Sequence, residues 1–309
     1  MSSLVGQSFA LAYQGEVAAA RAVADAAVEA GAEVGGRFAV LAHLALGYAA
    51  LAAGDVAAVH EARQAAGQQP TVIADATPLQ PPWNAEAALA DGDLTAACRW
   101  ADEAVSRSTG WYMVLALTVR ARVAIAADEL ERAERDARDA LTRCADLQAH
   151  LGIPDILECL AVVAGQAGSH REAARLFGAA AAIRIRIGAV RFKVYDAGYQ
   201  ASVAALRDAM GEQGFDSAWS EGAALSVEEA IAYAQRGRGK RKRPASGWAS
   251  LTPTERDVMR LVGDGLANND IAARLFVSPR TVSTHLTHIY NKLGLTSRVQ
   301  LAQEAARHH

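Results

Sequence analysis

The chain has 309 residues, of which 51% are hydrophobic and 21% charged, and this composition excludes a disordered or fibrous protein. The length leaves room for two domains. Alanine, the best helix former, is abundant and runs of β-branched residues are scarce, so the composition predicts an all-α protein. The three cysteines form no CxxC pair, and the longest apolar stretch, residues 39–54, is short for a membrane span. We therefore expect a cytoplasmic protein without a disulfide framework and without a membrane partner.

The two ends of the chain carry opposite charge. Residues 1–235 hold 18 Lys and Arg against 29 Asp and Glu, a net charge of −11, whereas residues 236–309 hold 13 against 5, a net charge of +8. A basic unit behind an acidic body is typical of a protein whose C-terminal part binds a polyanion and whose N-terminal part does not.

A short pattern recurs five times in the acidic part. Each copy has a small residue, then a polar residue, then an alanine within a few positions, and successive copies are 39, 38, 35 and 41 residues apart. The copies begin at Gly15, Gly54, Gly92, Ala127 and Gly168. Glycine ends a helix at low cost in the left-handed conformation, and a following Asp, Glu or Ser caps the next helix. The pattern predicts stacked helical hairpins, because one hairpin alone cannot bury its apolar face.

These hairpins resemble the tetratricopeptide repeat, although the period is irregular and the large aromatic signature residues are mostly absent. We predict a TPR-like solenoid over residues 1–235 that acts as a sensor or interaction domain, with a non-repetitive helical bundle as the alternative. The proline-rich stretch 69–82 is expected to be a loop. Residues 170–187 form the last predicted repeat helix, and helices near 195–211 and 226–236 are expected to cover the end of the stack.

Residues 236–247 are rich in Arg, Lys, Gly, Pro and Ser and lack large apolar side chains. Such a segment cannot offset the entropy cost of ordering, so it predicts a basic flexible linker. Beside a DNA-binding unit, four consecutive basic residues of this linker would attract phosphate without sequence preference. They are Lys240, Arg241, Lys242 and Arg243.

Residues 248–309 are predicted to form a separate domain of four short helices. The first begins at Pro253, with Thr252 as its N-cap and Glu255 completing a capping box. The second covers residues 269–275 and has Asn268 as its N-cap.

The third helix is predicted from Pro279 to about Leu293, where Gly294 stops it, and the fourth from about Ser297. At about 100° per residue, four apolar side chains of the third helix fall on one side and predict its buried face. These are Val282, Leu286, Ile289 and Leu293. The opposite side is polar and basic, and the helix contains no carboxylate. A helix of this kind packed on two others predicts a recognition helix for the major groove of DNA.

Many residues of this region match, in order, one known pattern. They are Leu251-Thr252-Pro253 with Glu255, Gly265, Asn268, Ile271-Ala272, Leu275, Ser278, Thr281-Val282, His285-Leu286, Lys292-Leu293 and Ser297-Arg298. The region resembles the LuxR-type helix-turn-helix over its full length. The resemblance implies a transcription regulator that binds double-stranded DNA in a sequence-specific way.

The same resemblance implies roles for particular residues. Ser283, Thr284 and Thr287 are expected to face the edges of the bases. The residues expected to contact phosphate are Arg280, Thr281, Lys292 and Arg298. Two positions that are often basic in the family are here Ser283 and Asn269, so less charge lies at the groove and the basic linker gains importance for affinity.

One recognition helix covers only a few base pairs, so we expect a homodimer that reads two half-sites. The predicted fourth helix, around residues 299–306, and the repeats are candidate dimer contacts. RNA polymerase is a further expected partner, and the repeats are expected to respond to a protein, a peptide or a small molecule. A basic cluster near the last repeat hints at an acidic partner, although a solvated face is the favoured interpretation. The cluster is Arg184, Arg186, Arg191 and Lys193.

The sequence contains no P-loop, no HExxH motif, no nucleophile elbow and no paired-cysteine metal site, so it predicts no enzyme, no cofactor and no metal. The acidic part also resembles the C-terminal repeat region of large ATP-dependent LuxR regulators. One alternative is therefore that this chain is the C-terminal portion of such a regulator. Another is a repeat scaffold whose basic tail binds nucleic acid without specificity.

Overall fold

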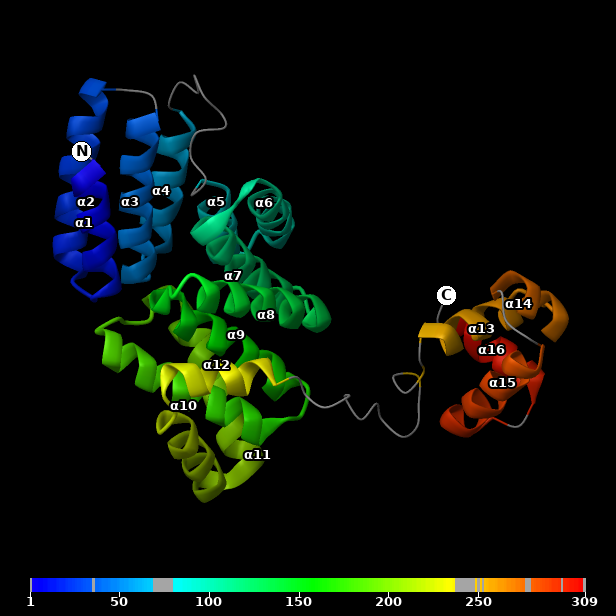
Figure 1. Cartoon of the computed structure of the whole chain (residues 1–309). Coiled ribbons are helices and arrows are strands. Elements are labelled where there is room, and N and C mark those ends of the chain that lie inside the picture. Colours follow the sequence, from blue (N-terminus) through cyan, green and yellow to red (C-terminus); the bar gives the residue numbers. More distant parts are fainter. Residues whose placement is uncertain are drawn as a thin grey trace. The chain divides into compact units, whose positions relative to one another are not determined.

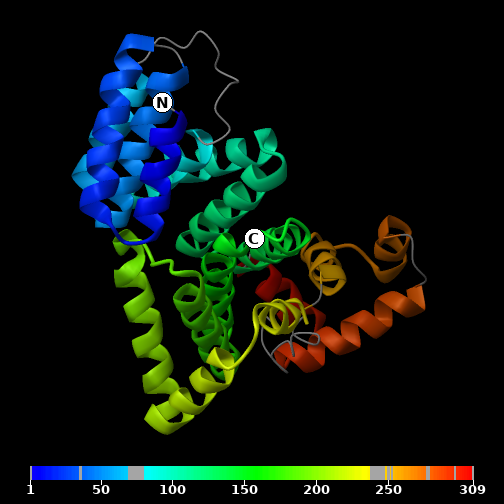
Figure 2. The ribbon, with the colours of Figure 1, turned by 60° about the vertical axis from the view of Figure 1, so that its left-hand side comes forward.

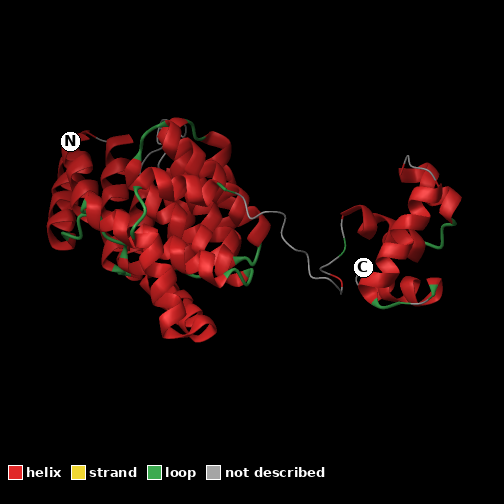
Figure 3. Cartoon of the chain, turned by 60° about the horizontal axis from the view of Figure 1, so that its bottom comes forward, coloured by secondary structure: helices red, strands yellow, loops and turns green. Residues whose placement is uncertain are grey.

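The computed structural model describes residues 2–34, 37–68, 80–236, 248, 251, 253–275, 279–295 and 297–307. Within these ranges every secondary-structure element is a helix (Figure 3), which confirms the predicted all-α class. The chain divides into two compact units, residues 1–236 and residues 237–309.

The first unit is a series of antiparallel helix pairs (Figure 1). Its helices are α1 (Ser2–Tyr13), α2 (Val17–Val34), α3 (Arg37–Ala53), α4 (Val56–Gly67), α5 (Gln80–Ala90), α6 (Leu94–Arg107), α7 (Gly110–Ala126), α8 (Leu130–Asp146), α9 (Ile153–Gln166), α10 (His170–Ile187), α11 (Asp196–Ala223) and α12 (Val227–Gln235), with short 3₁₀ turns at His150–Gly152 and Lys193–Tyr195. From α1 to α11 each helix packs on the next, α1 also packs on α3, α5 on α7, and α7 on α9, whereas α12 packs on α8 and α10. The pairs therefore stack, as the recurring pattern predicts, while the tetratricopeptide class itself stays a prediction.

The five predicted hairpin turns are present. At each one a residue takes the left-handed conformation, with φ between 59° and 83°. Two backbone hydrogen bonds close the turn, as where Gly54 N–H donates to Leu51 O at 3.1 Å and Asp55 N–H donates to Ala50 O at 3.0 Å. The same pair of bonds recurs at the other four turns. This is the Schellman arrangement, in which one left-handed residue satisfies the last carbonyls of the helix.

Two local details differ from the expectation. In the fourth turn the left-handed residue is Asp128 rather than the small Ala127, because aspartate tolerates this conformation better than other residues with a side chain. Asp55 and Asp93 cap the helices that follow them through their carboxylates, whereas Ser169 makes no such bond.

The proline-rich stretch also differs from a simple loop. Pro81 and Pro82 lie in the first turn of α5, where their missing N–H groups cost nothing. Residues 69–79 lie outside the described ranges. Proline therefore marks the start of a helix here.

The end of the stack is covered by α11 and α12, near the predicted positions. Gly211, with φ of 70°, breaks α11 into two helical parts, and the second part was not predicted. The two glycines Gly178 and Gly222 bring α10 and α11 into very close contact. A Cβ on Gly222 would overlap the carbonyl oxygen of Arg175, and one on Gly178 would overlap that of Trp219. Glycine is thus required at this crossing for its lack of a side chain.

The chain between α10 and α11 turns back to the first hairpins (Figure 2). Val190 N–H donates to Tyr13 O at 2.8 Å, and the ring of Phe192 packs on those of Tyr13 and Tyr48. The prediction of a solvated basic face near the last repeat is wrong for two of its four residues. Arg184 is buried and pairs with Asp155, and half-buried Arg191 pairs with Glu158, each at 2.6 Å.

The second unit packs four helices around its own core. They are α13 (Pro253–Gly263), α14 (Asn268–Leu275), α15 (Pro279–Leu293) and α16 (Arg298–Arg307). Gly265 and Gly294 take left-handed conformations just after α13 and α15, as expected of helix stops. The buried core joins side chains of all four helices, among them Val258, Ile271 and Leu301.

Candidate nucleic-acid interface

The third helix of the second unit, α15, buries the predicted side. Val282, Leu286 and Ile289 are at most 5% exposed, and Leu293 is half-buried against the same core. This side packs on α13 and α14. Because one side of α15 is fixed inside the unit, its other side is the one that can enter a groove of DNA.

Two of the three predicted base-facing residues, Ser283 and Thr287, are described and are exposed on that other side. They lie one helical turn apart, and Thr287 Oγ1 donates to the carbonyl oxygen of Ser283 at 3.1 Å. This bond holds the threonine hydroxyl near the helix and leaves its lone pairs and its methyl group for the edge of a base. Asn268, at the start of α14, donates from Nδ2 to Ser283 Oγ at 3.4 Å.

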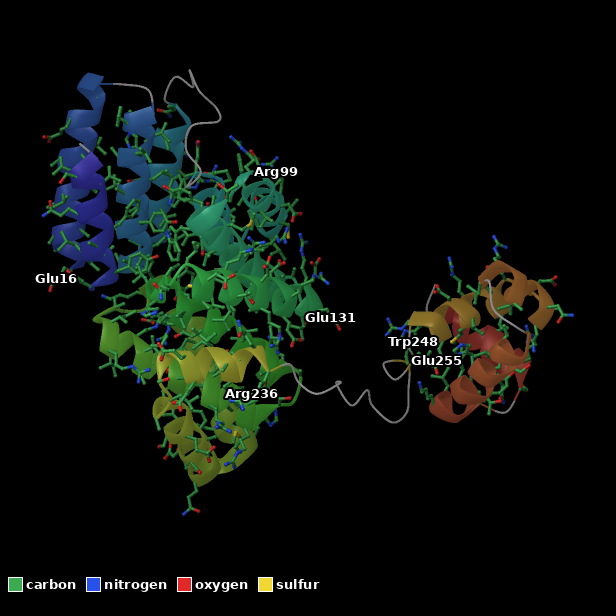
Figure 4. All side chains as sticks on the ribbon, viewed as in Figure 1. Glu16, Arg99, Glu131, Arg236, Trp248 and Glu255 are labelled. Atoms are coloured by element: carbon green, nitrogen blue, oxygen red, sulfur yellow. The ribbon has the colours of Figure 1, made fainter. Side chains whose placement is uncertain are left out.

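Lys292, a predicted phosphate contact, lies in an ion pair inside the unit. Its Nζ is 2.7 Å and 2.9 Å from the two carboxylate oxygens of Glu255 on α13, the residue labelled in Figure 4. Glu255 is only 2% exposed, whereas the Lys292 side chain is 26% exposed. The pair ties the end of α15 to the start of α13. Sequence reasoning placed Glu255 only in a capping box, because nothing in the spacing of 37 residues indicates this pairing.

Arg298, another predicted phosphate contact, also bonds within the unit. Its Nη1 donates to Asn268 Oδ1 at 2.9 Å and its Nη2 to Leu266 O at 2.5 Å. Asn268 is therefore not the expected N-cap of α14. It is the first residue of that helix, and its amide bridges Arg298 and Ser283. The bridge links the starts of α14 and α16 to the exposed side of α15.

The remaining candidates lie outside what the structure describes. The side chains of Arg280, Thr281 and Thr284 belong to this group, although the helix backbone that carries them is described. The linker residues Lys240, Arg241, Lys242 and Arg243 lie wholly outside the described ranges. Their assigned contacts with DNA stay predictions.

The expected dimer helix, α16, uses its apolar side within the unit. Leu301 and Ala305 are buried in the core, and α16 packs on α13. Its exposed residues include Gln300 and Gln303, with Ala302 half-buried. The contact with a second copy through α16 stays a prediction, and the side chains of Val299 and Ala306 lie outside the described ranges.

Comparison with known proteins identifies this unit. Residues 249–305 match the family model of bacterial regulatory proteins of the luxR family. These residues form a helix-turn-helix domain of the luxR family. No solved structure matches the chain significantly.

The relatives that match most of this chain are longer proteins. Two candidate HTH-type transcriptional regulators, from Mycobacterium bovis and Mycobacterium tuberculosis, are each 57% identical over 304 residues, which is 98% of this chain and 34% of theirs. The chain thus spans about a third of the length of these curated relatives. The nitrate/nitrite response regulator NarL of Escherichia coli is 46% identical over 52 residues, 17% of this chain and 24% of its own length.

None of the described helices has the length and apolar character needed to cross a membrane. The described part of the chain holds no group of three or more His, Cys, Asp or Glu side chains arranged to bind a metal ion.

Proposed function

We propose that this protein is a transcription regulator that binds double-stranded DNA through α15 and whose activity is controlled through the helical-hairpin unit. The observation that carries the proposal is the exposed, carboxylate-free side of α15 inside a luxR-family domain. The net charge of +8 on residues 236–309 supports attraction to phosphate, while the net charge of −11 on residues 1–235 disfavours it.

Within this proposal the residues divide into two groups. Ser283, Thr284 and Thr287 read base edges, and Arg280, Thr281 and the basic linker contact phosphate. Lys292 and Arg298 position α15 through Glu255 and Asn268, and contribute to phosphate binding only through the part of each side chain that stays exposed. The division predicts that changes at the first residues alter sequence preference, and that changes in the linker weaken all DNA binding.

We further propose that the protein acts as a homodimer on two half-sites, with RNA polymerase as a downstream partner. The small reach of one recognition helix supports the dimer. Because Leu301 and Ala305 of α16 are buried within the domain, the hairpin unit is a second candidate for the contact between the copies. Analytical ultracentrifugation, free and on operator DNA, tests the dimer; a monomer in both states would refute it.

The experiment that tests the main proposal is selection of binding sites from random DNA with the full chain. We expect an enriched motif, and fluorescence anisotropy should show much tighter binding to that motif than to a scrambled duplex at moderate salt. Thr287→Val should weaken binding to the motif by about 1–2 kcal/mol and leave scrambled DNA unaffected. Gln300→Ala, at an exposed position on α16, is the matched control. Equal affinity for motif and scrambled DNA would instead support a scaffold with non-specific affinity.

The length of the relatives favours one alternative arrangement. Because 98% of this chain aligns with only 34% of each mycobacterial relative, the same two units also occur inside larger regulators. We propose that the function of α15 is the same in both settings. Direct comparison of the selected motif for this chain and for a full-length relative tests this.

A further inference from the structure

The hairpin unit contains a partly open cavity. This cavity, of about 270 Å³, lies between α5, α7, α9, α10 and the segment that returns before α11. Most of its wall is apolar or aromatic. This part includes Leu89, Ile125, Val162, Phe177, Tyr195 and Tyr199. One end of the wall is charged, and a mostly apolar cavity with a few convergent polar groups is the usual form of a small-molecule site.

Glu86, on α5, stands at the charged end. It is 3% exposed, and its Oε1 accepts a hydrogen bond from Arg122 Nη1 at 2.6 Å. Its second oxygen, Oε2, is buried and has no hydrogen-bond partner among the described residues. A buried carboxylate oxygen without a donor is costly, since the full loss of hydration is not offset. The carboxylate therefore presents an unused acceptor at the cavity.

The other carboxylates at this end are already neutralised. Asp155 receives Arg184 Nη2 at 2.6 Å and Arg122 Nη2 at 3.3 Å, and Glu158 receives Arg184 at 3.0 Å and Arg191 at 2.6 Å. Burial alone would raise the pKa of Asp155, yet the guanidinium groups of Arg184 and Arg122 hold that pKa below its ordinary value. Both acids are therefore paired with arginines.

Carboxylates outnumber guanidinium groups on the cavity wall itself, although the six charges of the cluster balance once the arginines behind the wall are counted. Three carboxylates and one guanidinium line the cavity, namely Glu86, Asp155, Glu158 and Arg122, whereas Arg184 and Arg191 do not. Both nearby tyrosine hydroxyls stay neutral, because burial raises the pKa of Tyr195 and Tyr199 above the ordinary value. A cation that donates a hydrogen bond suits such a wall, and an anion does not.

Size and access limit what can bind. An apolar cavity of about 150 Å³ is enough for benzene, so this one has room for a single ring with a short side chain. Its wall includes exposed Gly198 and half-buried Leu89 and Tyr199, whereas Glu86 is fully enclosed. A molecule entering past Gly198 with its charged group first would reach Glu86.

We propose that this cavity binds a small, protonated amine with an apolar or aromatic body, whose ammonium group donates a hydrogen bond to Glu86 Oε2. The site would be the point at which the hairpin unit receives its signal, and in that respect it rests on the proposed function. Its charged wall joins three successive hairpins, through Glu86, Arg122 and Asp155. A ligand that stabilises this wall therefore ties together helices that are distant in sequence.

The test is calorimetric titration of the full chain with two probes of matched shape, 2-phenylethylamine and 2-phenylethanol. We expect the amine to bind more tightly than the alcohol. Glu86→Gln should weaken binding of the amine by roughly tenfold or more, which is the size of one lost hydrogen bond to a charged group, and should change binding of the alcohol much less. Asp136→Asn is the matched control. Asp136 is also buried and paired with an arginine, Arg120 at 2.7 Å, but does not line the cavity.

A second variant keeps the test decisive if Glu86→Gln does not fold. Val162→Phe adds a ring to the cavity wall without touching the charged residues, and it should abolish binding of both probes. Binding of the amine that survives in Val162→Phe, or a preference of the wild-type chain for the alcohol, would overturn the proposal. DNA binding by the same preparations without probe is measured in parallel. Absence of amine binding by the wild-type chain with intact operator binding counts against the cavity alone, whereas absence of operator specificity in the wild-type chain counts against the proposed function.

Discussion

The two units use ion pairs in opposite ways. In the hairpin unit, arginines and carboxylates from α5, α7, α9 and α10 meet in the interior. Arg122 joins three successive hairpins, whereas Arg184 pairs with acids of its own hairpin. In the luxR-family domain, the described Glu255–Lys292 pair connects two neighbouring helices and sets the end of the recognition helix. The first arrangement builds an internal polar wall, and the second orients a surface.

This difference shows that net charge is a poor guide to where charges act. The acidic hairpin unit buries arginines together with carboxylates, as in the pair of Arg184 and Asp155, so these charges contribute little to its surface. In the basic domain, two of the basic residues expected at DNA are largely engaged within the unit. We therefore expect the basic linker to supply much of the attraction to phosphate.

The largest effect should follow from breaking the internal wall of the hairpin unit. Arg184→Met leaves Asp155 and Glu158 with fewer partners in a buried setting, and should cost about 3–5 kcal/mol of unfolding free energy in that unit. Hydrogen exchange measured by mass spectrometry, peptide by peptide, should show the loss in residues 80–236 and no change in residues 253–307. Arg143→Met removes an exposed pair with Asp139 and should cost no more than about 0.5 kcal/mol. Equal effects of the two variants would contradict the comparison.

The next effect concerns the close contact of α10 and α11. Gly222→Ala places a methyl group against the backbone of Arg175, and should cost about 1–3 kcal/mol, seen as a lower Tm of the hairpin unit. Gly214→Ala is the matched control on the same helix. Its Cβ would meet only an ordinary contact at 3.6 Å, so alanine should be neutral or slightly stabilising there.

A smaller effect is expected in the luxR-family domain. Lys292→Met removes the ammonium group that neutralises buried Glu255, and should destabilise this domain by about 1–2 kcal/mol, a value reduced because the lysine is partly exposed. Arg274→Met removes an equal charge from an exposed position on α14 and should leave stability unchanged. Faster hydrogen exchange throughout residues 279–295 in Lys292→Met alone would support a positioning role. If Lys292→Met loses DNA affinity without faster exchange, the result would instead support the earlier prediction that Lys292 contacts phosphate.

The smallest effect is a dependence on pH that should be confined to the hairpin unit. Burial raises the pKa of the Cys144 thiol to about 11, against about 8.5 in an unfolded chain. Because the unfolded chain loses this proton first, stability is fully present below about pH 8.5 and declines as the pH rises toward 11. Urea denaturation at pH 8 and at about pH 9.5 should show a decline about 1 kcal/mol smaller in Cys144→Ala than in the wild type. An identical decline in both would remove Cys144 as its cause.

Much of the fold was predictable because the deciding signals are local. Each hairpin turn needs one left-handed residue and a polar residue after it, and both are neighbours in sequence. The buried face of α15 follows from helical spacing alone, and its stop follows from Gly294. The same locality explains the errors. The left-handed residue of the fourth turn is Asp128 instead of Ala127, and Pro81 lies in a helix instead of a loop. Each outcome depends on which of two neighbouring backbone geometries is lower in energy.

What the sequence determined by itself is therefore the helices, their turns and the presence of a recognition helix with a polar outer side. What only the tertiary structure decided is which charges meet. Glu86 and Arg122 are 36 residues apart, and Arg184 and Asp155 are 29 apart, spacings that carry no pattern. Ion pairs and cavities depend on the packing of whole hairpins, because the energy of a charge is set by everything that surrounds it. For that reason Arg184 and Arg191, which the sequence placed on a solvated basic face, belong to the interior ion pairs of the hairpin unit.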